Sequence, residues 1–273
     1  MNRTIMDFIE EDVGYGDITT EAMGCSHTVY GDIIAKEPCV VAGLKEAACV
    51  FLQFDVKMEI LIKDGERASS EYVVANVVGP ANGVLTAERL ALNFIMQMSG
   101  IATKTRRMVD IARTSNPKVK VAATRKTTPG FRKFQKRAVA LGGGDTHRIR
   151  LDDMFLVKDN HIAAVGGISK ALERVKEAHF SKKIEVEVTK QAEVEEAALA
   201  GAHILMLDNM GLDEVKQASL WIKEHAPGVL IEVSGRISED NIAEYSPYAD
   251  VISVGGLTHS FNSTDFSLVL KGP

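Results

Sequence analysis

The 273-residue chain has few cysteines and no long apolar run. Its three cysteines, Cys25, Cys39 and Cys49, form neither a CxxC pair nor an even set. This excludes a disulfide scaffold and indicates reduced thiols. No run approaches the roughly 20 apolar residues of a membrane span, and the N-terminus lacks the apolar segment of a signal peptide. We therefore expect a cytoplasmic protein that does not act in a membrane.

Aromatic residues are also scarce, at 6% of the chain, and positive charge is in the minority, with a net charge of -5. Proteins that bind nucleic acid through a broad surface are usually basic as a whole, and those that bind single strands use stacking aromatics. Neither feature is present, so we expect no nucleic-acid partner.

Against this acidic background, residues 125–162 hold nine Lys and Arg, two His and three consecutive glycines. Two interpretations are open: a solvated helix face, or a pocket for an anionic ligand. For Arg132, Lys133 and Lys136, which fall on a helix predicted to begin at Pro129, we favour the solvated face.

The N-terminal part of the chain is rich in predicted strands. Val- and Ile-rich segments cover residues 28–43, 56–68 and 71–80, and a helix is predicted between the first two, at 45–54. Apolar residues then recur at helical spacing over residues 86–115, which predicts a long helix or a broken pair, with Thr86 as its cap. The methionines of this segment are predicted to pack in the core.

From residue 119 onward, strands alternate with helices. Predicted strands are residues 119–125, 154–159, 183–188, 203–208, 229–235 and 250–256. Predicted helices that separate the later ones are residues 167–178, 190–200, 211–225 and 238–244. This alternation is typical of right-handed parallel βαβ units. Six such strands predict a barrel that is smaller or more open than the eight-stranded form.

In parallel α/β folds, ligands bind at the carboxyl ends of the strands. Nearly every predicted strand here ends in a charged residue or a glycine turn. Arg125, His147, Arg148 and Lys158 flank strand ends and the glycine run. Arginine matches a carboxylate in bidentate fashion, so several cations in one pocket indicate a ligand with more than one negative charge.

Two further groups of residues end the later strands. Ser234-Gly235 and Gly255-Gly256 form glycine loops, whose backbone N–H groups suit phosphate. Glu187 and Asp208 are acidic ends among cations, suited to sugar hydroxyls, to Mg²⁺ through water or to a cationic transition state. Alternatively, these carboxylates form ion pairs with Lys126 or Lys158.

The segments RKTTPGFR, GGG, HR, LVKDNHI, EVEV, LDNM, EVSG and ISVGGLTHS, with GDITT and ERLALNFIMQMSGIAT upstream, resemble the quinolinate phosphoribosyltransferase family. The resemblance covers nearly the whole chain in order. It implies an N-terminal α/β sandwich at residues 1–100, joined by residues 262–273, and an open α/β barrel of six or seven strands at residues 101–261. It also implies a homodimer with shared active sites, and possibly a higher oligomer.

The resemblance further implies transfer of phosphoribose from phosphoribosyl pyrophosphate to quinolinate, with loss of CO₂, in NAD biosynthesis. Mg²⁺ would bind through phosphoribosyl pyrophosphate and water near Glu187 and Asp208, with no direct protein ligand. By the family pattern, quinolinate contacts fall on Arg89 of the partner, Arg125, His147, Arg148 and Lys158. Catalytic positions fall on Lys126, Glu187 and Asp208. Phosphate contacts fall on Ser234, Gly235, Arg236, Gly255 and Gly256.

Three positions depart from the family pattern. Thr146 stands where Asn is usual, Arg137 where Tyr is frequent, and Arg236 replaces the second glycine of the usual SGG. Arg236 either adds a phosphate contact or forces a non-glycine residue into the loop conformation.

Other functions are weighed against this one. A nicotinate phosphoribosyltransferase, or a pyrophosphorylase-like protein associated with molybdate transport, shares the fold, but a monoacid needs fewer cations. A metal enzyme using His147, His161 and Asp208 is a third alternative, although their spacing matches no metal-ligand motif.

Overall fold

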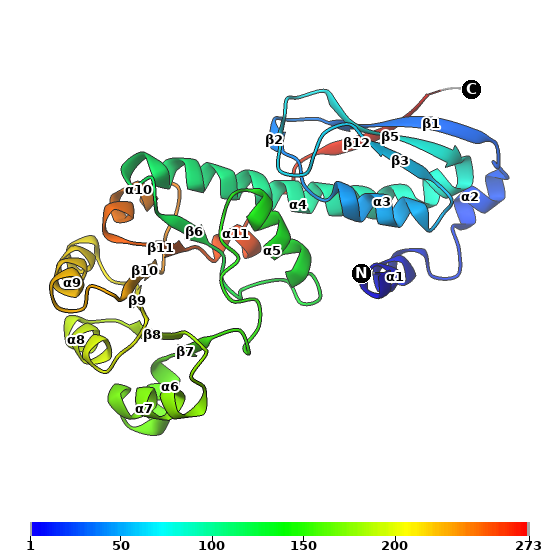
Figure 1. The fold of residues 1–273 in the computed structure, drawn as a ribbon. Coiled ribbons are helices and arrows are strands. Elements are labelled where there is room, and N and C mark those ends of the chain that lie inside the picture. Colours follow the sequence, from blue (N-terminus) through cyan, green and yellow to red (C-terminus); the bar gives the residue numbers. More distant parts are fainter. Residues whose placement is uncertain (1, 272–273) are drawn as a thin grey trace. The chain divides into compact units, whose positions relative to one another are not determined.

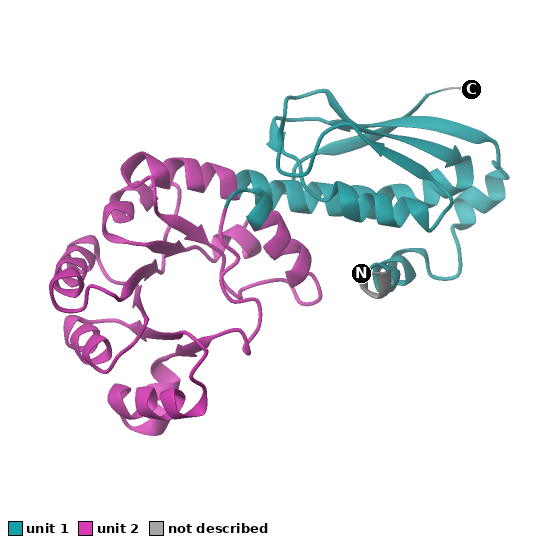
Figure 2. Cartoon of the chain, viewed as in Figure 1, with its two compact units in different colours: residues 1–104, 140–143, 261–273 teal, residues 105–139, 144–260 magenta. Residues whose placement is uncertain are grey.

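A computed structural model describes residues 2–271, with side chains from residue 5 onward, as two compact units (Figures 1 and 2). Unit 1 comprises Met1–Lys104, Ala140–Gly143 and Phe261–Pro273, and unit 2 comprises Thr105–Val139 and Gly144–Ser260. Helix α4, Ala81–Ser115, contributes to both units. The boundary predicted at residues 100 and 101 therefore lies within one continuous helix, and it remains a prediction.

Unit 1 is built on an antiparallel sheet. Its strands, in spatial order, are β12 (Phe266–Lys271), β1 (Thr28–Ala35), β5 (Tyr72–Pro80) and β3 (Lys57–Ile60). Its other elements are α1 (Asn2–Val13), α2 (Ile18–Met23), β2 (Cys39–Val40), α3 (Leu44–Leu52) and β4 (Arg67–Ala68). Helix α3 and the unit 1 part of α4 lie along one face of the sheet (Figure 1). The strand-rich N-terminal part and its α/β layering are confirmed.

The start of α4 differs from the prediction. Thr86 was expected to cap the helix, but α4 already begins at Ala81, directly after Pro80 ends strand β5. Thr86 instead donates a hydrogen bond from Oγ1 to Asp17 Oδ2, at 3.4 Å. Asp17 itself caps α2 by accepting from the backbone N–H groups of Thr19 and Thr20, each at 3.1 Å. The GDITT segment is thus a helix start.

Unit 2 contains the six predicted strands. They are β6 (Lys120–Ala122), β7 (Phe155–Val157), β8 (Ile184–Val188), β9 (Ile204–Asp208), β10 (Leu230–Ser234) and β11 (Val251–Ser253). Its helices are α5 (Arg132–Leu141), α6 (Asp159–Val165), α7 (Ile168–Ala178), α8 (Gln191–Leu199), α9 (Leu212–His225), α10 (Ile242–Tyr245) and α11 (Gly256–His259), with a 3-10 turn at Ser246–Tyr248.

All pairings in this sheet are parallel, and the strand order is β6-β11-β10-β9-β8-β7. Strands β6 and β7 are the two edges, so the sheet is open. An isolated parallel bridge pairs Ala122 of β6 with Asp145, so a one-residue seventh strand lies beside β6. Helices α6 to α10 lie outside the curved sheet (Figure 1). The expected open barrel of six or seven strands is confirmed.

Two expectations for the basic helix are wrong. Helix α5 begins at Arg132, three residues after Pro129. Lys133 is exposed, as expected, but Lys136 is only 1% exposed. It lies on the same side of α5 as Val139, which is three residues further on and fully buried. The amphipathic pattern predicts that a lysine faces solvent. Lys136 is buried instead because its ammonium donates hydrogen bonds to backbone carbonyl oxygens inside the protein.

None of the helices within residues 2–271 combines the length and the hydropathy that a membrane crossing requires. The 35-residue helix α4 is long enough, but charged side chains interrupt its apolar face.

Candidate active site

A cavity of about 550 Å³ opens at the carboxyl edge of the unit 2 sheet. The alternation of side chains along parallel strands explains which strand residues line it. Glu187 pairs with Met206, Met206 with Glu232, and Asp208 with Ser234 across neighbouring strands. These residues occupy every second position, so all face the cavity. Leu156 and Ser253 also line the cavity from within β7 and β11. The remaining lining residues lie in the segments between strands and helices: Ala123, Thr124, Arg125, Lys126, His147, Arg148, Lys158, Asn209, Gly235 and Arg236.

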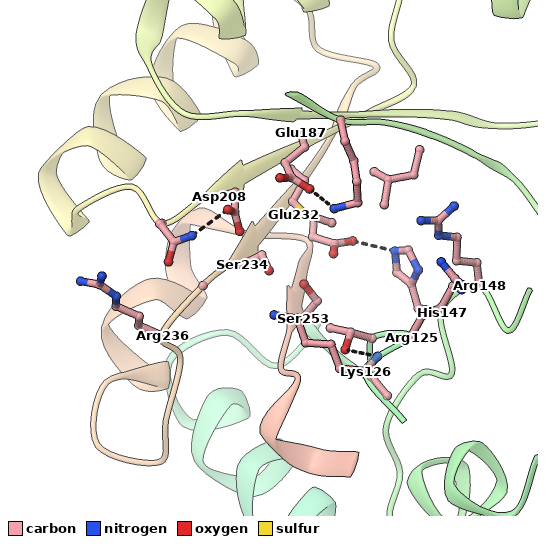
Figure 3. Close-up of a pocket in the computed structure, with 17 residues that line it drawn as sticks. Arg125, Lys126, His147, Arg148, Glu187, Asp208, Glu232, Ser234, Arg236 and Ser253 are labelled. Atoms are coloured by element: carbon pink, nitrogen blue, oxygen red, sulfur yellow. Dashed lines mark hydrogen bonds and ion pairs between the residues drawn. The ribbon is translucent and has the colours of Figure 1, made fainter. Parts of the chain in front are cut away.

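The cavity is cationic in a protein of net charge -5. Five Lys and Arg side chains line it, against three carboxylates. Arg125, His147 and Arg148 gather at one side, whereas Asp208, Ser234 and Arg236 lie at the other (Figure 3). Arg148 is buried, and both burial and the nearby Arg125 lower its pKa. Two guanidinium groups held this close repel each other unless an anion lies between them. Of the two interpretations of residues 125–162, this geometry favours the pocket for an anionic ligand.

Lys158 and Glu187 form an ion pair at the centre of the cavity wall. Lys158 follows strand β7, and its backbone N–H donates to Nδ1 of His161 in the first turn of α6, at 3.0 Å. That hydrogen bond stabilises the backbone turn at Lys158, between strand β7 and helix α6. The lysine side chain is 42% exposed and the glutamate side chain 16%, so an entering anion has access to the ammonium. The sequence offered Lys126 and Lys158 as ion-pair partners for the acidic strand ends, and the structure pairs Lys158 with Glu187.

The opposite end of the cavity is formed by the turns after β9 and β10. Asn209, Gly235 and Arg236 all have positive φ, of 56°, 92° and 52°. A Cβ at Gly235 would lie 2.8 Å from the backbone nitrogen of Asn209, so the two turns pack as closely as glycine allows. Arg236 therefore adopts the conformation left by the glycine usual at its position, at a cost of about 1–2 kcal/mol. Asp208 accepts a hydrogen bond from Asn209 Nδ2 at 2.7 Å.

His147, which the sequence predicted as a site residue, contacts two buried carboxylates, and one of them, Glu232, was missed by the strand-end pattern. Nε2 of His147 lies 3.1 Å from Glu232 and 3.3 Å from Glu185. Burial by itself lowers the pKa of His147, but the hydrogen bonds and charges of Glu185 and Glu232 outweigh it and raise the pKa to about 10. Burial raises the pKa of Glu185. Glu232 sits two residues before Ser234, so strand alternation, rather than strand ends, would have revealed it.

Among the described residues, these three are the group that could hold a metal ion, because their potential ligand atoms all lie within 4.8 Å of one another. A protonated imidazole has no lone pair for a metal, and the raised pKa of His147 favours that form. The contacts that the structure shows are those of an ion-pair cluster between this imidazole and the two carboxylates. The alternative trio of His147, His161 and Asp208 is not brought together, because His161 lies outside the cavity wall.

The glycine run does not line the cavity. Gly144 is required by close packing, since a Cβ there would lie 2.7 Å from Thr105 Cγ2 and 3.0 Å from the carbonyl oxygen of Val121. The predicted residues Gly255 and Gly256 start the short helix α11 and are not among the lining residues. Arg89 is an exposed residue of α4 in unit 1.

The fold and the cavity define a class: an open-barrel α/β enzyme with a site for a small, multiply charged anion. The family model for quinolinate phosphoribosyl transferase, C-terminal domain, matches residues 101–269, and its N-terminal domain model matches residues 17–99. The chain therefore belongs to the quinolinate phosphoribosyltransferase family and is a pentosyltransferase.

Individual relatives agree with this assignment. The chain is 47% identical to a probable nicotinate-nucleotide pyrophosphorylase [carboxylating] of Methanocaldococcus jannaschii, over 95% of this chain and 93% of the relative. It is 39% identical to the human nicotinate-nucleotide pyrophosphorylase [carboxylating], over 86% of this chain and 80% of the relative. The structure of the nicotinate-nucleotide pyrophosphorylase from Francisella tularensis superposes with a TM-score of 0.92 at 36% identity, covering 98% and 95% of the two chains. These names favour the carboxylating enzyme over the nicotinate and molybdate-associated alternatives.

Proposed function

We propose that this enzyme transfers phosphoribose from phosphoribosyl pyrophosphate to the ring nitrogen of quinolinate. Pyrophosphate leaves C1 of the ribose, the carboxylate at C2 of the ring leaves as CO₂, and a proton takes its place. The product is nicotinate mononucleotide. One observation carries the proposal: the cavity has two chemically different ends, with Arg125, His147 and Arg148 at one and with Asp208, Ser234 and Arg236 at the other (Figure 3).

At the cationic end, Arg125, His147, Arg148 and Lys158 suit the two carboxylates of quinolinate. Guanidinium forks bind planar carboxylates in bidentate fashion and fix their orientation. Nε of Arg125 is buried without a hydrogen-bond partner, which leaves this guanidinium short of acceptors within the described protein. A diacid supplies such acceptors, and holding it directs the ring nitrogen toward the sugar carbon.

At the other end, Ser234, Gly235 and Arg236 suit the 5′-phosphate, with Gly255 and Gly256 proposed as a second phosphate loop. Asp208 at this end and Glu187 on the neighbouring strand face the cavity. Loss of pyrophosphate leaves positive charge on the ribose, and the two carboxylates stabilise that charge. Lys126 is proposed to contact the phosphoribosyl group.

Mg²⁺ is proposed as the cofactor. Glu187 and Asp208 offer the oxygen donors that this ion prefers. Each already has a protein partner, in Lys158 and Asn209. This donor set fits an ion held by pyrophosphate oxygens and water, with the two carboxylates as outer contacts. When bound, the ion offsets the charge of the leaving pyrophosphate.

We also propose a homodimer in which Arg89 of one subunit enters the site of its partner, and a cytoplasmic location. The family resemblance and the exposure of Arg89 on α4 support the shared site. Cell fractionation tests the location.

An endpoint assay tests the function. Purified protein receives phosphoribosyl pyrophosphate with either quinolinate or nicotinate, each with Mg²⁺ or with a chelator, and nicotinate mononucleotide and CO₂ are measured. Product and CO₂ from quinolinate alone, only with Mg²⁺, support the proposal. Product from nicotinate alone would reassign the arginines, and product from neither substrate would overturn the proposed reaction.

A further inference from the structure

Helix α5 carries a buried lysine that the reaction scheme does not use. Lys136 is 1% exposed, and its Nζ donates to the backbone carbonyl oxygen of Ala123, at 3.0 Å, and to that of Thr146. Burying an ammonium is costly unless hydrogen bonds compensate for the lost hydration. Burial lowers the pKa of Lys136 to about 8, with the positive charge of Arg132 contributing and Asp145 opposing. The free-energy cost of burying this ammonium indicates that Lys136 has a role at its buried position.

The two carbonyl groups belong to the two backbone segments that carry the cationic end of the cavity. Ala123 directly follows strand β6, two residues before Arg125, and Thr146 directly precedes His147 and Arg148. These segments are linked otherwise by the backbone hydrogen bonds of the Ala122–Asp145 bridge. Lys136 thus joins them a second time, at the residues nearest the arginines.

The second of these segments needs support, because its backbone is strained. His147 has φ of 49°, in the left-handed region, where residues other than glycine are uncommon. Its N–H donates to Asp145 Oδ1 at 2.8 Å, while Lys136 holds the carbonyl group of the preceding residue. Strained residues persist at sites where the surroundings fix them from several directions. Here the strain turns His147 toward Glu232 and leaves Arg148 on the cavity wall.

We propose that Lys136 is a positioning residue for the dicarboxylate end of the site. Its ammonium ties the backbone before Arg125 to the backbone before His147 and Arg148, and so sets the spacing of the two guanidinium groups that clamp the diacid. The part that names the diacid rests on the proposed function. The tether itself does not.

The kinetic test compares three variants. Lys136→Met removes both hydrogen bonds at similar volume, Lys136→Gln keeps two N–H donors without the charge, and Lys133→Met is the matched control on the exposed face of α5. We expect Lys136→Met to raise KM for quinolinate about tenfold or more, since small misplacements of binding groups cost up to about 10²-fold. KM for phosphoribosyl pyrophosphate should rise much less, because Ser234 and Asp208 lie on strands that Lys136 does not contact and only Lys126 lies on a tethered segment. Lys136→Gln should recover part of the loss.

A second measurement does not depend on activity. Hydrogen exchange of peptides spanning residues 142–150 should become faster in Lys136→Met, and unchanged in Lys133→Met, relative to peptides from strands β9 and β10. Should Lys136→Met fail to fold, Lys136→Gln gives the same two readouts at a smaller amplitude.

The outcomes separate the two proposals. If the wild-type protein is inactive with quinolinate but hydrogen exchange of residues 142–150 is faster in Lys136→Met, the proposed reaction is overturned and the tethering role of Lys136 is supported. Active wild-type protein whose Lys136 variants lose thermal stability, with both KM values and local exchange unchanged, would overturn the positioning role and keep the reaction.

Discussion

Nε2 of His147 lies 3.1 Å from a carboxylate oxygen of Glu232, and both side chains are largely shielded from water. Glu185, with no exposed side-chain surface, lies 3.3 Å from the same nitrogen. One N–H cannot satisfy two carboxylates, and oxygens of both glutamates remain without a hydrogen-bond partner. This arrangement favours a charged imidazole and raises the pKa of Glu185, chiefly through burial.

The cluster predicts a specific pH dependence of stability. Because the pKa of His147 rises from 6.5 to about 10 on folding, its contribution is complete below pH 6.5 and lost as the pH rises toward 10. Denaturant unfolding of wild-type protein and His147→Asn, which tolerates a left-handed backbone, should show a stability difference that shrinks between pH 7 and 9. The slope should approach about 1 kcal/mol per pH unit. A difference that stays constant over this range would contradict the charged imidazole.

Arg148→Lys should weaken quinolinate binding while folding stays intact. Lysine keeps the charge but loses the planar fork, so we expect KM for quinolinate to rise about tenfold or more, equivalent to at least about 1.4 kcal/mol. Thermal stability should be unchanged, because the lysine keeps the positive charge that Arg148 places beside Arg125. Steady-state kinetics and thermal melting provide the check, and unchanged kinetics would remove Arg148 from the site.

Arg236 should show opposite effects on stability and on binding. Arg236→Gly relieves the positive φ, whereas Arg236→Ala retains it, so the glycine variant should be more stable than the alanine variant by roughly 1 kcal/mol. Both should raise KM for phosphoribosyl pyrophosphate to the same extent if the guanidinium contacts phosphate. Unchanged KM in both variants would assign Arg236 no part in binding.

Glu187→Gln and Asp208→Asn should lower kcat by about 10²-fold, the usual effect of losing one electrostatic contact to a transition state. In Glu187→Gln the Lys158 ammonium also loses its ion pair, so quinolinate binding should be equal or tighter. Pre-steady-state kinetics separate the two effects. A rise in KM with kcat intact would place these carboxylates in binding alone.

Arg89→Ala and Arg125→Ala subunits should complement each other if sites are shared. A mixed dimer then contains one site free of both substitutions, so purified mixed dimers should have up to about half the activity of a wild-type dimer, following the two-fold symmetry of such dimers. Differently tagged subunits allow the mixed species to be purified before the assay. Verified mixed dimers without activity would show that each subunit uses its own Arg89.

Much of the architecture follows from local pattern. The six strands of unit 2 were predictable because short Val- and Ile-rich segments alternate with helices, and parallel strands place their carboxyl ends at one edge. For the same reason Arg125, Lys158, Glu187 and Asp208 could be predicted to meet, and all four line the same cavity. The helix start at Thr86 failed because Pro80 had already ended the strand, and the first turn needs no Thr cap.

The sequence by itself determined the fold class, the strand ends and the excess of cations among them, since these depend on periodicity and on neighbours along the chain. Only the tertiary structure decided which charges are buried and with what partners. Glu185, Glu232 and His147 come from two strands and a strained turn, and Lys136 reaches carbonyl groups ten and thirteen residues away. The free energy of a buried charge depends on the dielectric environment and on hydrogen bonds around it, and both are created by residues distant in sequence.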